Sequence, residues 1–201
     1  MIALTVLTDA GQAEIGGADS RLLSSWDMAA PAGSPVHARP NIAEELKIDH
    51  PEISDGVACW RLAAATGVLD VNSRYAYLLW CRDFAATSVV ARRDGDVVGF
   101  VTGFRRPEQP STLVVWQVGV DADLRGRGVA AAMLDVLFDR VPGIDHLEAT
   151  VTPDNTGSAA LFGRFAERRG ARVRRTELFG AELLGDGHAP EILFRIGPVH
   201  R

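Results

Sequence analysis

Alternating apolar and polar positions in the middle of the chain predict three consecutive strands, at residues 87–92, 97–104 and 113–120. A period of two sends successive side chains to opposite faces of a sheet, which is typical of a strand with one buried face. The Asp94-Gly95 pair between the first two segments favours a tight hairpin turn. We therefore predict an antiparallel meander of three strands.

Apolar residues at helical spacing predict four helices around this meander. The first begins at Asp55 and ends at Gly67, and the second covers residues 75–84. The third follows the meander at 129–138, and the fourth covers 155–169 and is ended by a glycine. The residues that share one face of the second helix, and that we expect in the core, are Tyr77, Trp80, Cys81 and Phe84.

Further strands complete the predicted fold, one within residues 41–53 and others at 146–151, 173–179 and 192–196. A helix between two strands after the meander implies a parallel crossover in an otherwise antiparallel sheet. The predicted fold class is therefore α/β (mixed α+β), with a mostly antiparallel mixed sheet of about six to seven strands and helices on both faces.

Composition sets the expected domain organisation. A chain of 201 residues is long enough for one domain. Residues 1–38 are rich in Gly, Ala, Ser and Pro, which predicts a flexible leader, and we assign residues 39–201 to the folded domain. With 47% hydrophobic and 23% charged residues, the chain has the composition of a globular protein with a full core.

Charge and hydropathy argue against two classes of partner. A formal net charge of −5 offers no basic surface for nucleic acid. No uncharged apolar run approaches the roughly 18 residues of a membrane span, and the first residues lack the basic start of a signal peptide. We therefore expect a cytoplasmic protein without a membrane partner, in which Cys59 and Cys81 are buried, reduced thiols. Apolar positions expected to be exposed on the final strands favour a homodimer.

The segment from Arg125 to Ala130 carries the clearest chemistry, because it joins a strand to the start of a helix. Unpaired N–H groups at a helix N-terminus bind phosphate. Gly126 and Gly128 lack the Cβ atoms that would keep a pyrophosphate from the backbone, and Arg127 adds positive charge. The glycines also fit a dinucleotide fingerprint, but the hairpin before them is unlike the start of the βαβ unit that such a fold requires.

A single glycine, Gly119, interrupts the β-branched strand before this loop. Isolated glycines in strands indicate either a β-bulge or a place where another group lies close against the backbone. Either alternative would shape the backbone beside the expected phosphate site.

The pattern Arg125-x-x-Gly128-x-Ala130 after a strand resembles the acetyl-CoA signature of the GNAT acetyltransferase superfamily. The resemblance implies that the loop cradles the CoA pyrophosphate and that the preceding strand receives the pantetheine arm; we expect no metal. The residues implied for acetyl-CoA binding are Val118, Val120, Arg125, Gly126, Arg127, Gly128, Val129, Ala130 and Asn155. Asn155 is equally suited to cap the helix that follows it.

Stretches outside this loop resemble one family within the superfamily, the L-2,4-diaminobutyrate acetyltransferases of ectoine biosynthesis. They are Asp55-Gly56-x-x-x-Trp60-x-Leu62, Leu69-Asp70-Val71-Asn72-Ser73-x-Tyr75-x-Tyr77, Trp116-Gln117-Val118 and Pro153-Asp154-Asn155. The resemblance implies that acetyl-CoA donates its acetyl group to the side-chain (Nγ) amine of L-2,4-diaminobutyrate, a small-molecule substrate, by direct transfer. The alternatives are a GNAT enzyme for another small amine or a protein amine, and a CoA-sensing module without catalysis.

The same resemblance implies acidic side chains that hold the ammonium groups of the acceptor and aromatic side chains that form the walls of its site. The candidates for substrate binding are Asp70, Tyr75, Trp116, His188 and Glu191, and those for proton transfer are Asp70, Glu191 and Tyr75. Structural alternatives exist for all of them: a helix cap for Asp70, packing for the aromatic residues, and a solvated loop for His188 and Glu191.

The helix at 155–169 departs from the superfamily pattern at Phe162, where many GNAT enzymes carry a tyrosine that protonates the leaving thiolate. A thiolate with a solution pKa near 8.5 leaves with little help. We therefore expect proton removal through water, with Asp70 or Glu191 nearby, and the identity of the base stays open.

Overall fold

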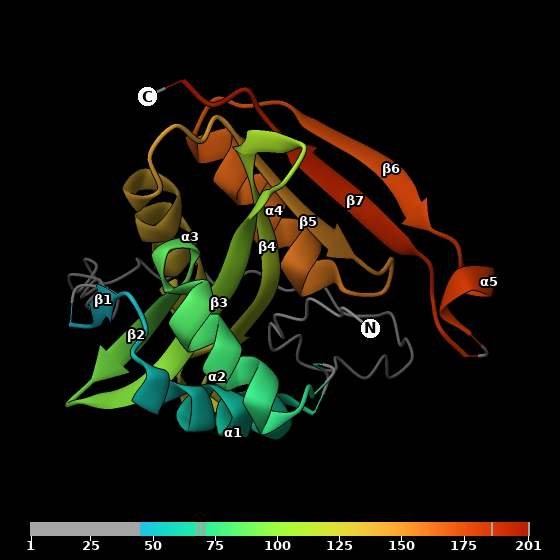
Figure 1. Cartoon of the computed structure of the whole chain (residues 1–201). Helices are drawn as coiled ribbons and strands as arrows, with labels where there is room; N and C mark the ends of the chain where they lie inside the picture. Colours follow the sequence, from blue (N-terminus) through green and yellow to red (C-terminus); the bar gives the residue numbers. More distant parts are fainter. Residues whose placement is uncertain (1–44, 68, 70, 186, 201) are drawn as a thin grey trace, which may run out of the picture.

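The computed structural model describes residues 45–67, 69, 71–185 and 187–200 of the chain. The leader expected at 1–38 and the candidate site residue Asp70 lie outside the described residues. Figure 1 shows the described part as one twisted sheet with helices packed against it.

The sheet has seven strands in the order β1-β2-β3-β4-β5-β7-β6. The strands are β1 Lys47–Asp49, β2 Val89–Arg93, β3 Asp96–Arg106, β4 Gln109–Val120, β5 His146–Val151, β6 Val173–Phe179 and β7 Glu191–Ile196. Only the β4–β5 pair is parallel, and every other pair is antiparallel. The predicted mixed, mostly antiparallel sheet is confirmed, including the crossover after the meander.

The four predicted helices are present as α1 Gly56–Thr66, α2 Arg74–Asp83, α3 Val129–Arg140 and α4 Thr156–Arg168. Their ends follow the expected chemistry: Gly67 ends α1 with a φ of 70°, and Ser73 begins α2 by accepting a hydrogen bond from the Ala76 N–H. A fifth helix, α5 Ala181–Leu184, was not predicted, because a single turn is too short to show a helical period.

The two faces of the sheet bury separate cores. Val89 and Ala91 of β2 pack in the larger core with α3 and α4, whereas Val90 between them packs in the smaller core with α1 and α2. Alternate residues of one strand therefore face different helices, as the period of two requires. This arrangement confirms helices on both faces (Figure 1).

The expected core face of α2 is only partly confirmed. Tyr77 and Cys81 are buried, with 1% and 4% of their surface exposed, and Trp80 is half-buried. The prediction is wrong for Phe84, which is 39% exposed. The helix ends at Asp83, so Phe84 leaves the helical period and stacks outside the core on Trp80, at 4.6 Å between ring centroids.

The two alternatives for Gly119 are resolved in favour of close packing. A Cβ atom at this position would lie 2.4 Å from Cε1 of the buried Phe100 ring. The bulge in β4 lies instead at Trp116, since Thr102 pairs with Gln117 and Gly103 with Val115. A bulge redirects the side chain at its site, so it decides where the Trp116 indole lies.

The parallel β4–β5 ladder is short, and this feature positions the site. It runs from Thr112 paired with His146 to Val114 paired with Glu148. Beyond these pairs β4 continues to Val120 and β5 to Val151, so the two strands diverge. The residues described include no helix long and apolar enough to cross a membrane.

Candidate active site

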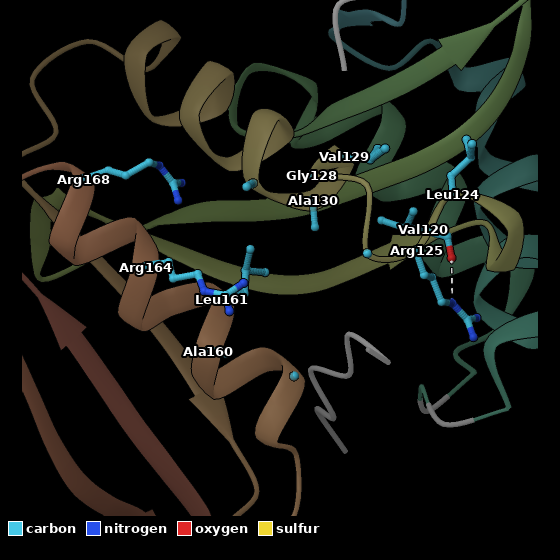
Figure 2. A pocket seen from close by; sticks show the side chains of 13 residues that line it. Val120, Leu124, Arg125, Gly128, Val129, Ala130, Ala160, Leu161, Arg164 and Arg168 are labelled. Carbon is cyan, nitrogen blue, oxygen red and sulfur yellow. Dashed lines mark hydrogen bonds between the residues drawn. The ribbon is translucent and has the colours of Figure 1, made fainter. Parts of the chain in front are cut away.

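A groove of about 250 Å³ lies between the start of α3 and the side of α4 (Figure 2). We call it the α3 groove. Its lining residues are Val120, Leu124, Arg125, Gly126, Gly128, Val129, Ala130, Ala131, Gly157, Ala160, Leu161, Arg164 and Arg168. Six of these thirteen residues are glycine or alanine, so an elongated ligand could lie directly against the backbone there.

The backbone at the start of α3 is suited to an anion. Gly126 and Gly128 have φ values of 70° and 84°, which turn the loop so that α3 begins at Val129. Gly128 is the N-cap and provides no side-chain cap, so no cap side chain among the described residues occupies the N–H groups of the first turn. A helix N-terminus with exposed N–H groups and a positive dipole end is a phosphate site.

Cationic side chains on both walls add to this field. Arg125 donates from Nε to the Val120 carbonyl oxygen at 3.3 Å, a contact that holds the side chain at the groove (Figure 2). Arg164 and Arg168 reach the groove from α4, and Arg168 is anchored by Asp135 at 2.8 Å. Arg127 is exposed and does not line the groove. The α3 groove therefore combines backbone donors with fixed cations.

The structure brings together most of the residues predicted for acetyl-CoA. Those that line the α3 groove are Val120, Arg125, Gly126, Gly128, Val129 and Ala130. Val118 is fully buried in β4, two residues before Val120. Asn155 caps α4 by accepting a hydrogen bond from the Ser158 N–H at 3.0 Å. The capping role of Asn155 is thus observed, and its predicted role toward a ligand stays a prediction.

A second cavity, of about 320 Å³, lies where the β3–β4 hairpin meets β5 and the β6–β7 pair. We call it the hairpin pocket. Its lining residues are Phe104, Arg106, Pro107, Glu108, Val114, Val115, Trp116, Glu148, Ala149, Thr150, Leu178, Phe179 and Leu193. The volume is at the lower end of the range for small-molecule sites.

Trp116 connects this pocket to the helix α2. Its ring lies 5.5 Å from the Trp80 ring and 6.4 Å from the Phe104 ring. Its indole Nε1 is buried and has no hydrogen-bond partner among the described residues. Such a buried donor is costly to leave unpaired, which makes it a candidate contact for a ligand.

Two arginines bracket a buried carboxylate at the edge of the hairpin pocket. Glu148 is 3% exposed and accepts hydrogen bonds from Arg106 Nη1 at 2.5 Å and from Arg195 Nη1. Arg195 also donates to Gln109 Oε1 at 2.8 Å. The group therefore carries a net positive charge and joins β3, β4, β5 and β7.

The other predicted acceptor residues are not gathered in one cavity. Glu191 is the first residue of β7 and is 4% exposed. It lies two residues before Leu193, so both side chains are on the same face of the sheet, and Leu193 lines the hairpin pocket. His188 is half-buried in the segment before β7, and Tyr75 is 67% exposed in the first turn of α2. Of the four predicted substrate residues that the structure describes, Trp116 lines the hairpin pocket, whereas Tyr75, His188 and Glu191 line neither this pocket nor the α3 groove.

The cysteines form a buried pair between α1 and α2. Cys59 is 2% exposed and Cys81 is 4% exposed. The pKa of the Cys59 thiol is raised, because it donates a hydrogen bond to Cys81 and is buried. Neither cysteine lines the α3 groove or the hairpin pocket, so this pair belongs to the core. No group of three or more metal-ligating side chains capable of holding an ion is found within residues 45–67, 69, 71–185 and 187–200.

Comparison with known proteins assigns these features to a class. Residues 56–166 match the model of the acetyltransferase (GNAT) family. The ribosomal-protein-alanine N-acetyltransferase from Brucella melitensis, at 20% identity, shares the fold with a TM-score of 0.61, covering 76% of this chain and 99% of that one.

The more similar relatives share one name. The L-2,4-diaminobutyric acid acetyltransferase of Streptomyces coelicolor is 57% identical over 160 residues, which are 77% of this chain and 94% of the relative. The diaminobutyrate acetyltransferase EctA from Paenibacillus lautus, solved with its substrate L-2,4-diaminobutyric acid and coenzyme A, is 41% identical. It superimposes with a TM-score of 0.75 and covers 78% of this chain and 97% of its own. The chain belongs to the L-2,4-diaminobutyric acid acetyltransferase family of GNAT enzymes.

Proposed function

We propose that this chain transfers the acetyl group of acetyl-CoA to the Nγ amine of L-2,4-diaminobutyrate in ectoine synthesis. The observation that carries the proposal is the position of the two cavities on β4. Val120 lines the α3 groove and packs on the α3 side, whereas Trp116 lines the hairpin pocket and packs against Trp80 of α2. A donor and an acceptor bound in these cavities would reach the same strand from opposite faces.

The donor binds along the α3 groove in this proposal. The N–H groups at the start of α3 and the Arg125 side chain hold the pyrophosphate, while Arg164 and Arg168 are placed for the remaining phosphate. Val118 and Val120 pair through backbone groups with the pantetheine arm, and one N–H of β4 polarises the thioester carbonyl. The diverging ends of β4 and β5 leave the space for the acyl group.

The acceptor is held by the residues that the family resemblance implies. Asp70 and Glu191 bind ammonium groups, Trp116 forms a wall, and Tyr75 and His188 complete the site. Glu191 and Trp116 support this assignment by their positions on neighbouring parts of one sheet face. Proton removal proceeds through water beside Asp70 or Glu191, and Tyr75 is the remaining candidate for proton transfer.

Positioning must decide which nitrogen reacts. A side-chain amine has a pKa near 10.4 and an α-amine one nearer 8, so solution chemistry disfavours Nγ by up to roughly 3 kcal/mol in free-base population. Well-oriented reactants gain about 7 to 11 kcal/mol, which is more than enough to reverse that preference. The site therefore needs fixed contacts to the α-ammonium and α-carboxylate.

The test is an assay of the purified chain with acetyl-CoA and L-2,4-diaminobutyrate, ornithine or lysine, with the product identified by NMR. We expect Nγ-acetyl-L-2,4-diaminobutyrate as the main product and lower kcat/KM for the longer diamino acids. Acetylation at the α-nitrogen, or preference for a peptide amine, would contradict the proposal. Binding of acetyl-CoA without turnover of any amine would support a sensing module instead.

Asp70 provides the most direct mutational test of the acceptor site. Asp70→Asn removes a charge-assisted hydrogen bond worth about 1.5–3 kcal/mol, so kcat/KM for diaminobutyrate should fall roughly 10–100-fold. The KM for acetyl-CoA should stay within about threefold of wild type. Asp94→Asn, in the exposed β2–β3 turn, is the matched control and should change neither value. Unchanged kinetics in Asp70→Asn would remove this residue from the site.

A homodimer and a cytoplasmic location complete the proposal. β6 is an edge strand, and Leu178, Phe179 and Leu183 beside its end are 41%, 38% and 70% exposed. Exposed apolar side chains on an edge strand are suited to a second copy. Light scattering should give the mass of a dimer, and Leu183→Glu should weaken it; a monomeric wild type would contradict this part. The buried free thiols suit a reducing compartment.

A further inference from the structure

The α-carboxylate of the proposed acceptor has no arginine or lysine partner among the acceptor-site residues considered so far. At neutral pH a 2,4-diamino acid has two ammonium groups and one α-carboxylate. Asp70 and Glu191 match only the ammonium groups. Since the α-carbon end must be held away from the thioester, a cation facing the acceptor cavity is required.

The hairpin pocket contains one such cation. Arg106 is the only basic residue among its lining residues, and Trp116, the predicted wall of the acceptor site, lines the same cavity. The acidic residues that line it are Glu148, which is neutralised by two arginines, and Glu108, which is exposed in the hairpin turn. An exposed carboxylate is screened by solvent and salt, so Glu108 competes only weakly with a ligand for the Arg106 guanidinium.

The geometry of Arg106 leaves donors for a ligand. Its only hydrogen bond to a described residue runs from Nη1 to Glu148 Oε2, and its side chain is 38% exposed. A guanidinium has five N–H donors in a planar fork, so Nη2 and Nε stay available. The second oxygen of Glu148 is taken by Arg195, which fixes the carboxylate and hence the Arg106 side chain.

A second unpaired donor lies on the same cavity. The buried indole Nε1 of Trp116 has no acceptor within the part of the chain that the structure describes. A pocket with two such donors, one of them a guanidinium, selects a ligand group that is both an acceptor and an anion. A carboxylate meets both requirements.

We propose that Arg106, oriented by Glu148, binds the α-carboxylate of the diamino acid and thereby turns the side-chain amine toward the acyl group. This inference rests on the proposed function. It makes Arg106 a specificity determinant, because an acceptor without a carboxylate gains nothing from this contact. Arg195 has a different role in this scheme, since it shares Glu148 but does not line the pocket.

The test compares two acceptors in two variants. L-2,4-diaminobutyrate and 1,3-diaminopropane carry the same kind of side-chain amine and differ in the carboxylate. In Arg106→Gln, kcat/KM for diaminobutyrate should fall roughly 10–100-fold, the size of one lost charge-assisted contact, while that for diaminopropane changes less than about threefold. Arg195→Gln, which loosens Glu148 but leaves the Arg106 fork in place, should change the ratio of the two substrates much less than Arg106→Gln does.

Each outcome separates binding from a purely structural role. Equal losses for both acceptors in Arg106→Gln, or a loss of discrimination in Arg195→Gln as large as in Arg106→Gln, would overturn the inference. If Arg106→Gln does not fold, Arg106→Lys decides: it keeps the charge without the fork, so the substrate ratio should fall partway, and an unchanged ratio contradicts the proposal. A wild type that ignores diaminobutyrate would refute the proposed function as well, whereas normal Nγ-acetylation with unchanged discrimination in the variants refutes this inference alone.

Discussion

The α3 groove and the hairpin pocket lie along the same strand but are built in different ways. The groove is formed by one continuous segment, 120–131, and by one side of α4. The pocket collects side chains from the β3–β4 hairpin, from β5, and from the ends of β6 and β7. Chain segments nearly ninety positions apart, such as Arg106 and Leu193, therefore meet only in the folded molecule.

The difference teaches how each cavity recognises its ligand. The α3 groove presents backbone N–H groups, whose direction is set by local turns and by the start of a helix. The hairpin pocket presents side chains, whose direction is set by a bulge at Trp116 and by the ion pairs around Glu148. Changes in the groove should therefore act on the donor alone, and changes in the shared strand should act on both.

The largest effect is expected from a side chain added inside the groove. Gly126 and Gly143 have nearly equal φ values, 70° and 69°, and an added Cβ at either has no neighbour within 4 Å. Gly126→Ala and Gly143→Ala should thus lose similar stability, about 1–2 kcal/mol from the left-handed backbone. Only Gly126→Ala would displace N–H groups that we propose bind phosphate, so its KM for acetyl-CoA should rise roughly 10–100-fold.

Steady-state kinetics measure the KM values of these two variants, and thermal unfolding measures their stability. Equal KM values for acetyl-CoA in the two variants would show that backbone strain alone, and not a change in the α3 groove, alters acetyl-CoA binding. The KM for diaminobutyrate should stay near the wild-type value in both.

A smaller effect is expected in the strand that the cavities share. Gly119→Ala places a methyl group 2.4 Å from Phe100, which is 1% exposed and cannot move away without disturbing the smaller core. Overpacking of this kind costs about 1–3 kcal/mol of unfolding free energy, measurable by denaturant titration. Because β4 must shift, the KM values of both substrates should rise together; an effect on only one would show that the cavities are independent of this strand.

The smallest effect on stability and kinetics is expected from loss of the hydrogen bond between Tyr77 and Gln117. The buried Tyr77 hydroxyl donates to Gln117 Oε1 at 3.0 Å, next to the Trp116 bulge. Tyr77→Phe leaves this acceptor with one partner fewer and should cost about 1 kcal/mol, with no change in the KM for acetyl-CoA. A rise in that KM would mean that the two sides of β4 are coupled here.

The pH dependence of the same variant has a defined sign. Burial raises the pKa of Tyr77, so the folded state favours the protonated phenol. The stabilisation is therefore complete below the pKa of an unfolded tyrosine, near 10, and is lost as the pH rises through the higher pKa of the folded state. Wild type and Tyr77→Phe should converge in unfolding free energy in that alkaline range. A difference that does not change with pH would contradict the raised pKa of the buried Tyr77 phenol.

The order and kind of the main elements follow from local patterns. Period-two segments gave β2, β3 and β4, the Asp94-Gly95 turn joins the first two of them, and Gly67 ends α1 as predicted. One failure occurred where packing and not pattern decides: Phe84 lies outside the core because α2 stops one residue earlier. For Gly119 the sequence left two alternatives open, and only the structure selected close packing on Phe100. Helical spacing of apolar residues predicts which side of a helix is buried, but it does not fix the residue at which the helix ends.

By itself, the sequence determined the backbone of the proposed phosphate site at the start of α3, since two glycines and a helix start are local features whose geometry hardly depends on the rest of the chain. Only the tertiary structure decided which residues meet in the hairpin pocket. Glu148 became a fixed anion between Arg106 and Arg195 because sheet order places β5 between β4 and β7. Contacts between side chains of neighbouring strands cannot be predicted from the pattern of one sequence, because register and sheet order arise from packing of the whole domain.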